Sequence, residues 1–126
     1  MQRTVSTDDA PAAVGAYSQA TTNGDLVFTA GQLPMTPDGE LLDDRSVAEQ
    51  TDRCLENVAA ILESEGLSLS DVLKVSVFLD DVDDFEEMND VYSDYFGEEP
   101  PARSALEVGK VPKGAALEIE AIAAAK

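Results

Sequence analysis

The stretch Val72-Leu73-Lys74-Val75-Ser76-Val77-Phe78-Leu79 is rich in β-branched and other apolar residues, which predicts a β-strand. The segments on either side of it have helical periodicity. Before it, Ser46-Val47-Ala48-Glu49 has the form of a capping box, and apolar residues then recur at spacings of three and four until Gly66. After it, residues 84–96 place their apolar side chains on one helical face and end at Gly97. The strand is therefore expected to lie between two amphipathic helices in the chain.

Further strand signals occur near both ends of the sequence. Residues 17–22 and 25–32 are joined by Asn23-Gly24, the strongest short-range signal for a β-hairpin. Residues 103–108 and 116–124 predict the last two strands. This order of strands and helices predicts an α+β fold, with a mixed sheet of five or six strands and two helices on one face.

Two helices leave the other face of such a sheet uncovered. In the last predicted strand, alternation puts Leu117 and Ile119 on one side and Ile122 on the other, beside Glu118 and Glu120. Apolar side chains are therefore expected on both faces. We expect the uncovered face to meet another copy of the chain in a homo-oligomer.

Composition limits the classes of function. With 126 residues, 44% of them hydrophobic, residues 1–126 are expected to form a single domain around one core. The chain has 26 Asp and Glu against 8 Lys and Arg, a net charge of −18. We therefore expect no nucleic-acid partner and no anionic membrane surface, since both need clustered cations. So acidic a chain fits a halophilic host, whose salt screens its self-repulsion.

The residues that usually ligate transition metals are almost absent. The sequence has no His and one cysteine, Cys54, so we expect no metal and no cofactor. The acidic run at residues 80–84 lacks the glycine and distal glutamate of an EF-hand and is interpreted as a solvated loop. The first residues lack the apolar stretch of a signal peptide, and no window approaches 18 apolar residues. We therefore expect a cytoplasmic protein.

Arg103 is a scarce fixed cation at the start of a predicted strand. Its guanidinium can bind a carboxylate through two parallel hydrogen bonds, which points to small acids as ligands. If residues 103–108 and 116–124 pair as an antiparallel hairpin, Arg103 lies near Glu118 and Glu120. Spacing alone leaves two interpretations open: a ligand site, or a cross-strand ion pair worth about 0.2–1 kcal/mol.

Six ordered blocks of sequence resemble the RidA family, also called YjgF/YER057c/UK114, over nearly the whole chain. These blocks are residues 10–19 (APAAVGAYSQ), 29–34 (TAGQLP), 75–79 (VSVFL), 88–89 (MN), 101–104 (PARS) and 118–123 (EIEAIA). The resemblance implies a chorismate-mutase-like fold and a homotrimer with active sites between subunits. It also implies hydrolytic deamination of 2-imino acids and their enamine tautomers, such as 2-iminopropanoate and 2-iminobutanoate, to 2-keto acids and ammonia.

The resemblance also assigns roles to individual residues. It makes Arg103 the residue that binds the substrate carboxylate and Glu118 the base that orients water, with Tyr17 closing or polarising the cleft. Gly31, Asn89 and Ala105 match substrate-binding positions of the family by their place in the sequence alone. Many members have cysteine where this chain has Ala105, so a thiol-based role is not expected here. The chain also departs from the family at Ala16, where the usual residue is proline.

Several alternatives remain open from the sequence. Glu120 lies two residues from Glu118 on the same strand face and is a second candidate base, and Glu107 shares the face of Arg103 and is a candidate to neutralise it. The same cleft could serve a non-catalytic sensor of small carboxylates, which needs the arginine alone. A ribonuclease or translation inhibitor fits worst, because the acidic surface repels RNA.

The halophilic expectation predicts a salt-dependent stability. Raising KCl from about 0.1 M to about 1 M shortens the Debye length from ~10 Å to ~3 Å and screens repulsion among the carboxylates. The free energy of unfolding, measured by urea titration at each salt concentration, is therefore expected to rise with salt. A protein no less stable at low salt would contradict the expectation.

Overall fold

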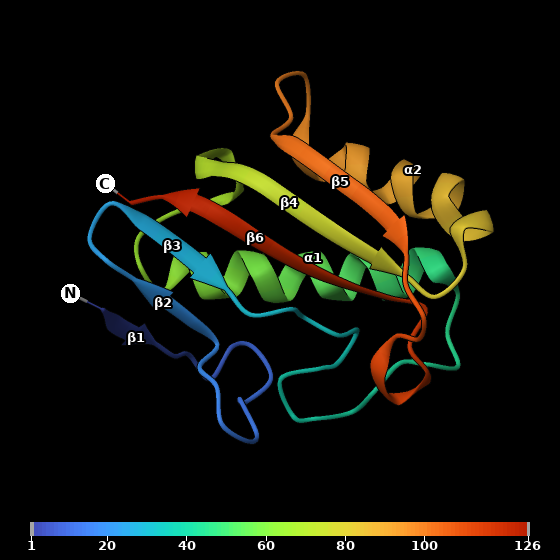
Figure 1. Ribbon diagram of the computed structural model, residues 1–126, viewed down its shortest axis with the longest axis horizontal. Coiled ribbons are helices and arrows are strands. Elements are labelled where there is room, and N and C mark those ends of the chain that lie inside the picture. Colours follow the sequence, from blue (N-terminus) through green and yellow to red (C-terminus); the bar gives the residue numbers. More distant parts are fainter. Residues whose placement is uncertain (1, 126) are drawn as a thin grey trace.

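The computed structural model describes residues 2–125 as a six-stranded mixed sheet with two long helices, in the strand order β1-β2-β3-β6-β4-β5 (Figure 1). The strands are β1 (Arg3–Val5), β2 (Ala20–Thr22), β3 (Leu26–Thr29), β4 (Val72–Leu79), β5 (Ala102–Glu107) and β6 (Leu117–Ala124). The helices are α1 (Val47–Glu63) and α2 (Phe85–Phe96), and short 3₁₀ turns are η1 (Leu69–Asp71), η2 (Val82–Asp84) and η3 (Pro112–Gly114).

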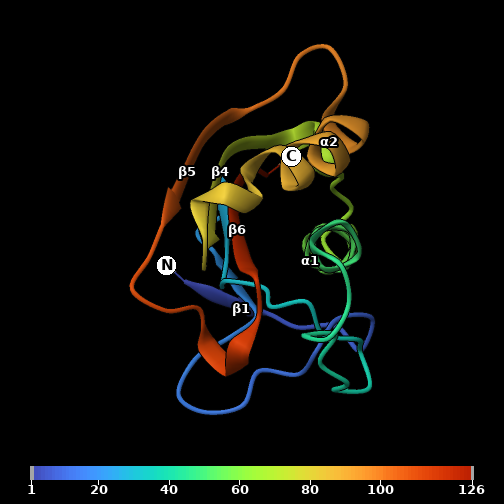
Figure 2. The same cartoon turned by 90° about the vertical axis from the view of Figure 1, so that its right-hand side faces the viewer.

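Both helices cover the same face of the sheet, as predicted (Figure 2). Alternate residues of β4 and β6, such as Val77 and Ile119, point to this face and are fully buried against Leu55 and Ile61 of α1. Each such side chain contributes about 1.5–3 kcal/mol by leaving water. The core therefore lies between one face of the sheet and the two helices.

Helix α1 follows the predicted stripe of buried residues. Ser46 caps its start, accepting a 3.1 Å hydrogen bond at Oγ from the Glu49 backbone N–H, but the reciprocal Glu49 contact runs to the Ser46 hydroxyl rather than to its backbone. Cys54 on this stripe is fully buried, and burial raises the pKa of its thiol well above the usual value. The cysteine is therefore a core residue.

Two buried amides on α1 lie outside the predicted apolar stripe. Asn57 Nδ2 donates hydrogen bonds to the carbonyls of Leu33 and Met35, at 3.2 and 2.8 Å. Gln50 Nε2 donates to the Arg45 carbonyl at 2.9 Å. Both amides are almost completely buried. They fix the loop that joins β3 to α1 against the helix, where backbone carbonyls would otherwise lack partners.

The predicted hairpin between residues 103–108 and 116–124 is wrong. Strand β4 lies between the two: it pairs with β5 in parallel and with β6 in antiparallel register. The reason is the crossover through α2, which returns the chain parallel to β4 on its outer edge. Strand β5 is consequently an edge strand, and its far side pairs with no strand of residues 2–125 (Figure 1).

The N-terminal strands are shorter than predicted. The Asn23-Gly24 turn joins β2 and β3 as expected, but residues 17–19 precede β2 as a loop, and β1 was not predicted. In this loop the buried Gln19 side chain donates hydrogen bonds to the carbonyls of Thr7, Ala10 and Pro11. Side-chain hydrogen bonds therefore take the place of a strand ladder here.

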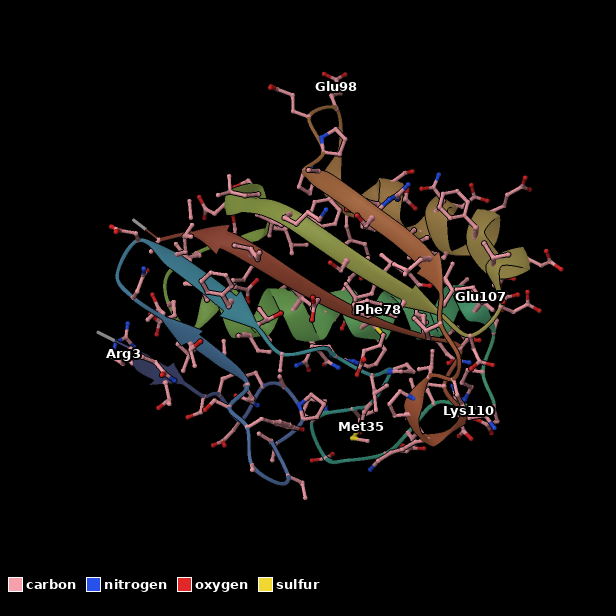
Figure 3. All side chains as sticks on the ribbon, in the orientation of Figure 1. Arg3, Met35, Phe78, Glu98, Glu107 and Lys110 are labelled. Atoms are coloured by element: carbon pink, nitrogen blue, oxygen red, sulfur yellow. The ribbon has the colours of Figure 1, made fainter. Side chains whose placement is uncertain are left out.

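The second face of the sheet bears apolar side chains without a covering layer. Phe28 on β3 and Leu106 on β5 are 43% and 44% exposed, and Phe78 and Ile122 on the same face are half-buried. Phe78 is labelled in Figure 3. The predicted uncovered apolar face is thus present. None of the helices within residues 2–125 is long and apolar enough to cross a membrane.

Candidate active site

Arg103 is held by aromatic rings and an amide on the helix-covered face of the sheet. Its guanidinium carbon lies 4.6 Å from the ring centroid of Tyr92 and 5.2 Å from that of Phe85, both on α2. Its Nη1 donates a 2.7 Å hydrogen bond to Asn89 Oδ1. The rings attract the cation without neutralising it, each such contact being worth about 0.5–1 kcal/mol or more when desolvated.

Arg103 is also the one arginine within residues 2–125 that forms no ion pair with a carboxylate. Arg3, Arg45 and Arg53 pair with glutamates at 2.6 to 3.4 Å. Glu107, a candidate to neutralise Arg103, instead accepts a 2.9 Å hydrogen bond from the Val82 backbone N–H. The Arg103 guanidinium borders a cavity of about 270 Å³ and keeps donors for a carboxylate from outside the chain.

Glu118 lies on the other face of the sheet, at a second cavity of about 380 Å³ that is also lined by Tyr17, Gly31 and Lys113. We call this cavity the Glu118 pocket. A Cβ atom at Gly31 would lie 2.7 Å from Glu118 Cδ and 2.9 Å from its Cγ. Only glycine at position 31 therefore leaves room for the glutamate side chain in its present place.

The surroundings of Glu118 favour its protonated form. Burial raises the pKa of this carboxyl above the usual 4.5, and the neighbouring charge of Glu120 raises it further. Glu120 points to the same face but does not line the Glu118 pocket. The geometry favours Glu118 over Glu120 as the group that a bound molecule would meet.

Tyr17 forms the exposed wall of the Glu118 pocket. The residue is 54% exposed, and its hydroxyl oxygen accepts a long 3.4 Å hydrogen bond from the Val14 backbone N–H. Gln19, which anchors residues 7–11, lines the same cavity. The loop that carries Tyr17 is therefore attached to the body of the protein through Gln19.

The structure separates the predicted site residues into two groups. Arg103 pairs in register with Val75 on the helix-covered face, whereas Glu118 pairs with Phe78 on the open face. Asn89 lies with Arg103, and Tyr17 and Gly31 lie with Glu118. The expectation that strand pairing brings Arg103 beside Glu118 within one chain is therefore wrong, because β4 separates their strands and the two side chains point to opposite faces.

Ala105, a predicted substrate-binding residue, shares the face of Arg103 and packs against the core. The sequence pattern places Phe85 and Tyr92 on the apolar face of α2 and gives them no role at the site. Their spacing from Asn89, at four and three residues, places all three on one side of the helix, and this signal could have linked them to Arg103. Within residues 2–125, no group of three or more His, Cys, Asp or Glu is placed to hold a metal ion.

Comparison with known proteins identifies the family of this fold and site. The family model described as Endoribonuclease L-PSP matches residues 7–125. The chain belongs to this family, which is the YjgF/RidA family, so the predicted resemblance is confirmed. Its fold is the α+β, chorismate-mutase-like fold expected from the sequence.

The relatives cover almost the whole chain. A RutC family protein of Pyrococcus abyssi is 50% identical over 117 residues, which are 93% of this chain and 92% of that protein. An Escherichia coli protein named 2-iminobutanoate/2-iminopropanoate deaminase is 43% identical, with 98% of each chain covered. The crystal structure of E. coli TdcF with bound serine has a TM-score of 0.92 and 41% identity, covering 98% of this chain and 99% of that one.

The contact between Gly31 and Glu118 predicts a stability effect that depends on both residues. Gly31→Ala is expected to lower the free energy of unfolding by about 1 kcal/mol, the low end for overpacking, because the glutamate side chain can swing aside. Urea denaturation measures the loss, and Gly109→Ala is the matched control, since its added Cβ would meet nothing within 4 Å.

The same substitution should cost less in a Glu118→Ala background, where the clashing atoms are gone. Equal losses for Gly31→Ala in the two backgrounds would contradict the proposed contact.

Proposed function

We propose that this protein hydrolyses 2-imino acids, including 2-iminobutanoate and 2-iminopropanoate, to 2-keto acids and ammonia. The observation that carries the proposal is Arg103, which forms no ion pair with a carboxylate of residues 2–125 although the chain has 26 acidic residues. Family membership and the name of the E. coli relative support the reaction.

A small carboxylate is the ligand that best fits the cavity of about 270 Å³ beside Arg103. The guanidinium is always charged, and stacking on Tyr92 and bonding to Asn89 restrict its movement before a ligand arrives. The arginine side chain therefore loses little conformational entropy when a carboxylate binds. The serine bound to E. coli TdcF is a small molecule of this kind in a related protein.

Glu118 is the proposed general base. Its carboxylate accepts a proton from water as the oxygen attacks the carbon of the protonated imine, which gives a neutral tetrahedral carbinolamine. Glu118 then returns that proton to the amine nitrogen. As the C–N bond breaks and the C=O bond forms, the carbinolamine hydroxyl gives its proton to Glu118 and ammonia leaves. Tyr17 closes or polarises the cleft. One positioned base contributes about 10²–10⁴-fold, which suffices for an imine that already reacts with water.

The proposal requires a second chain, because Arg103 and Glu118 of one chain point to opposite faces of the sheet. A homotrimer, as the family resemblance implies, would bring Arg103 of one chain to the Glu118 pocket of the next. The unpaired edge of β5 and the exposed Leu106 and Phe28 support such an assembly.

The rival function is a sensor that binds small carboxylates without chemistry. It needs Arg103 but no base, and the serine of TdcF is equally compatible with it. Cleavage of RNA, which the description of the family model names, is opposed here by the net charge of −18.

The decisive experiment generates 2-iminobutanoate in situ with an L-amino-acid oxidase and follows release of 2-ketobutanoate. Wild type is expected to accelerate release over buffer. Arg103→Ala should lower kcat/KM by about 10- to 150-fold, which corresponds to a lost charged hydrogen bond of about 1.5–3 kcal/mol. Glu118→Gln should lower kcat by about 10²–10⁴-fold.

Arg45→Ala is the matched control for loss of an arginine, since Arg45 is exposed and pairs with Glu49 away from both cavities. It is expected to leave the rate unchanged. If wild type bound 2-ketobutanoate but did not accelerate its release, the sensor interpretation would replace the enzyme interpretation.

The raised pKa of Glu118 predicts the pH dependence. A general base acts as its carboxylate, so kcat/KM should rise with pH through a pKa above 4.5. Glu120→Gln removes a like charge that raises this pKa, so the acid limb of the profile should move to lower pH. Glu63→Gln, on the exposed end of α1, should leave the limb in place. A limb unmoved by Glu120→Gln would contradict the assignment of Glu118.

A further inference from the structure

Lys113 lies at the tip of η3 and lines the Glu118 pocket. It is the one cation among the residues that border this cavity, whereas Glu118 is the one acid there. Lys113 forms no ion pair with a carboxylate of residues 2–125. An unpaired positive charge therefore stands at a cavity in a chain whose net charge is −18.

The backbone of Lys113 is in a conformation that residues with a Cβ rarely adopt. Its φ of 62° and ψ of 17° lie in the left-handed region, and it is the one non-glycine residue within residues 2–125 with a positive φ. Glycine takes this conformation freely, as Gly114 does beside it. Strained residues of this kind gather at binding sites, so we take Lys113 as a candidate binding residue.

Both ends of the turn are fixed to the body of the protein. On one side, the Val111 backbone N–H donates a 2.9 Å hydrogen bond to the Asp80 carboxylate. On the other, the Ala116 N–H donates to Gln50 Oε1 at 2.9 Å, and the Ala116 carbonyl accepts from Asp80 N–H. Only residues 112–115 lie between these anchors. The position of the Lys113 Cα at the pocket is therefore set by the fold.

An anionic substrate needs such a charge at this cavity. A 2-imino acid carries a carboxylate, and the surface that it approaches is strongly acidic, with Glu118 inside the pocket. Local positive charge at a cleft can raise the rate of encounter with an anion by ~10–10³-fold. Burial and the charge of Glu120 are the causes of the raised pKa of Glu118, so the role argued for Lys113 is to bind the anion and not to adjust the base.

We propose that Lys113 is an anion-binding residue of the Glu118 pocket that captures the carboxylate of the incoming substrate, in addition to Arg103. This inference rests on the proposed deaminase function. It assigns Lys113 to substrate capture, so its loss should raise KM and leave kcat in place.

The test compares Lys113→Gln with Lys110→Gln, which removes the same charge three residues away from a side chain that does not line the pocket. In the view of Figure 3, Lys110 lies on the opposite side of the turn from Met35, a pocket residue. Lys113→Gln should lower kcat/KM for 2-iminobutanoate about 10-fold at about 0.1 M KCl, and less at about 1 M KCl, where charges are screened. Lys110→Gln should retain the wild-type value.

Lys113→Gly separates capture from folding. It should be no less stable than wild type in urea, because glycine fits the left-handed conformation, yet it should lose capture as Lys113→Gln does. Equal kcat/KM values for Lys113→Gln and Lys110→Gln, or a loss confined to kcat, would overturn the inference.

Pyruvate binding, measured by calorimetry, provides a readout that does not need catalysis. Lys113→Gln should bind pyruvate more weakly than Lys110→Gln does. If wild type has no deaminase activity, the proposed function is wrong, but weaker pyruvate binding by Lys113→Gln than by Lys110→Gln would still support Lys113 as an anion-binding residue. Equal pyruvate binding by the two variants would refute that role of Lys113.

Discussion

The alternation of side chains along a β-strand is the constraint on which the rest of this structure depends. It sends one set of residues of β4 and β6 into the core beneath α1 and α2, and the other set, including Glu118, to an open face. Because Arg103 on β5 shares the core side, the two charged groups are separated by the thickness of the sheet. The proposed reaction therefore requires that two chains assemble.

Neither charged group of the candidate site forms an ion pair within residues 2–125. Arg103 is held by the rings of Phe85 and Tyr92 and by an amide oxygen, none of which cancels its charge. Glu118 lies so close to Gly31 that a Cβ atom there would clash with it, and burial raises the pKa of its carboxyl. In a protein with a net charge of −18, Arg103, which has no ion-pair partner among residues 2–125, is the stronger indication of a ligand site.

The elements set by local patterns could be predicted from the sequence, and their partners in space could not. Helix α2 and strand β4 follow from periodicity and a terminal glycine within residues 72–97, and the Asn-Gly turn follows from its own chemistry. The pairing of β5 was mispredicted because adjacency along the chain favoured a hairpin, whereas the crossover through α2 placed β4 between. Arg103 could be singled out by its scarcity, but its aromatic neighbours share one stripe with core residues, so periodicity alone could not separate them.

The burial of Cys54 gives the protein a practical property. With its single thiol enclosed in the core and held in the protonated form, the folded chain presents no reactive sulfur to an alkylating dye. A cysteine introduced at Leu106, which is 44% exposed on the edge strand, would therefore take up a fluorophore at one known place. Energy transfer between labelled chains could then report how copies of this protein come together.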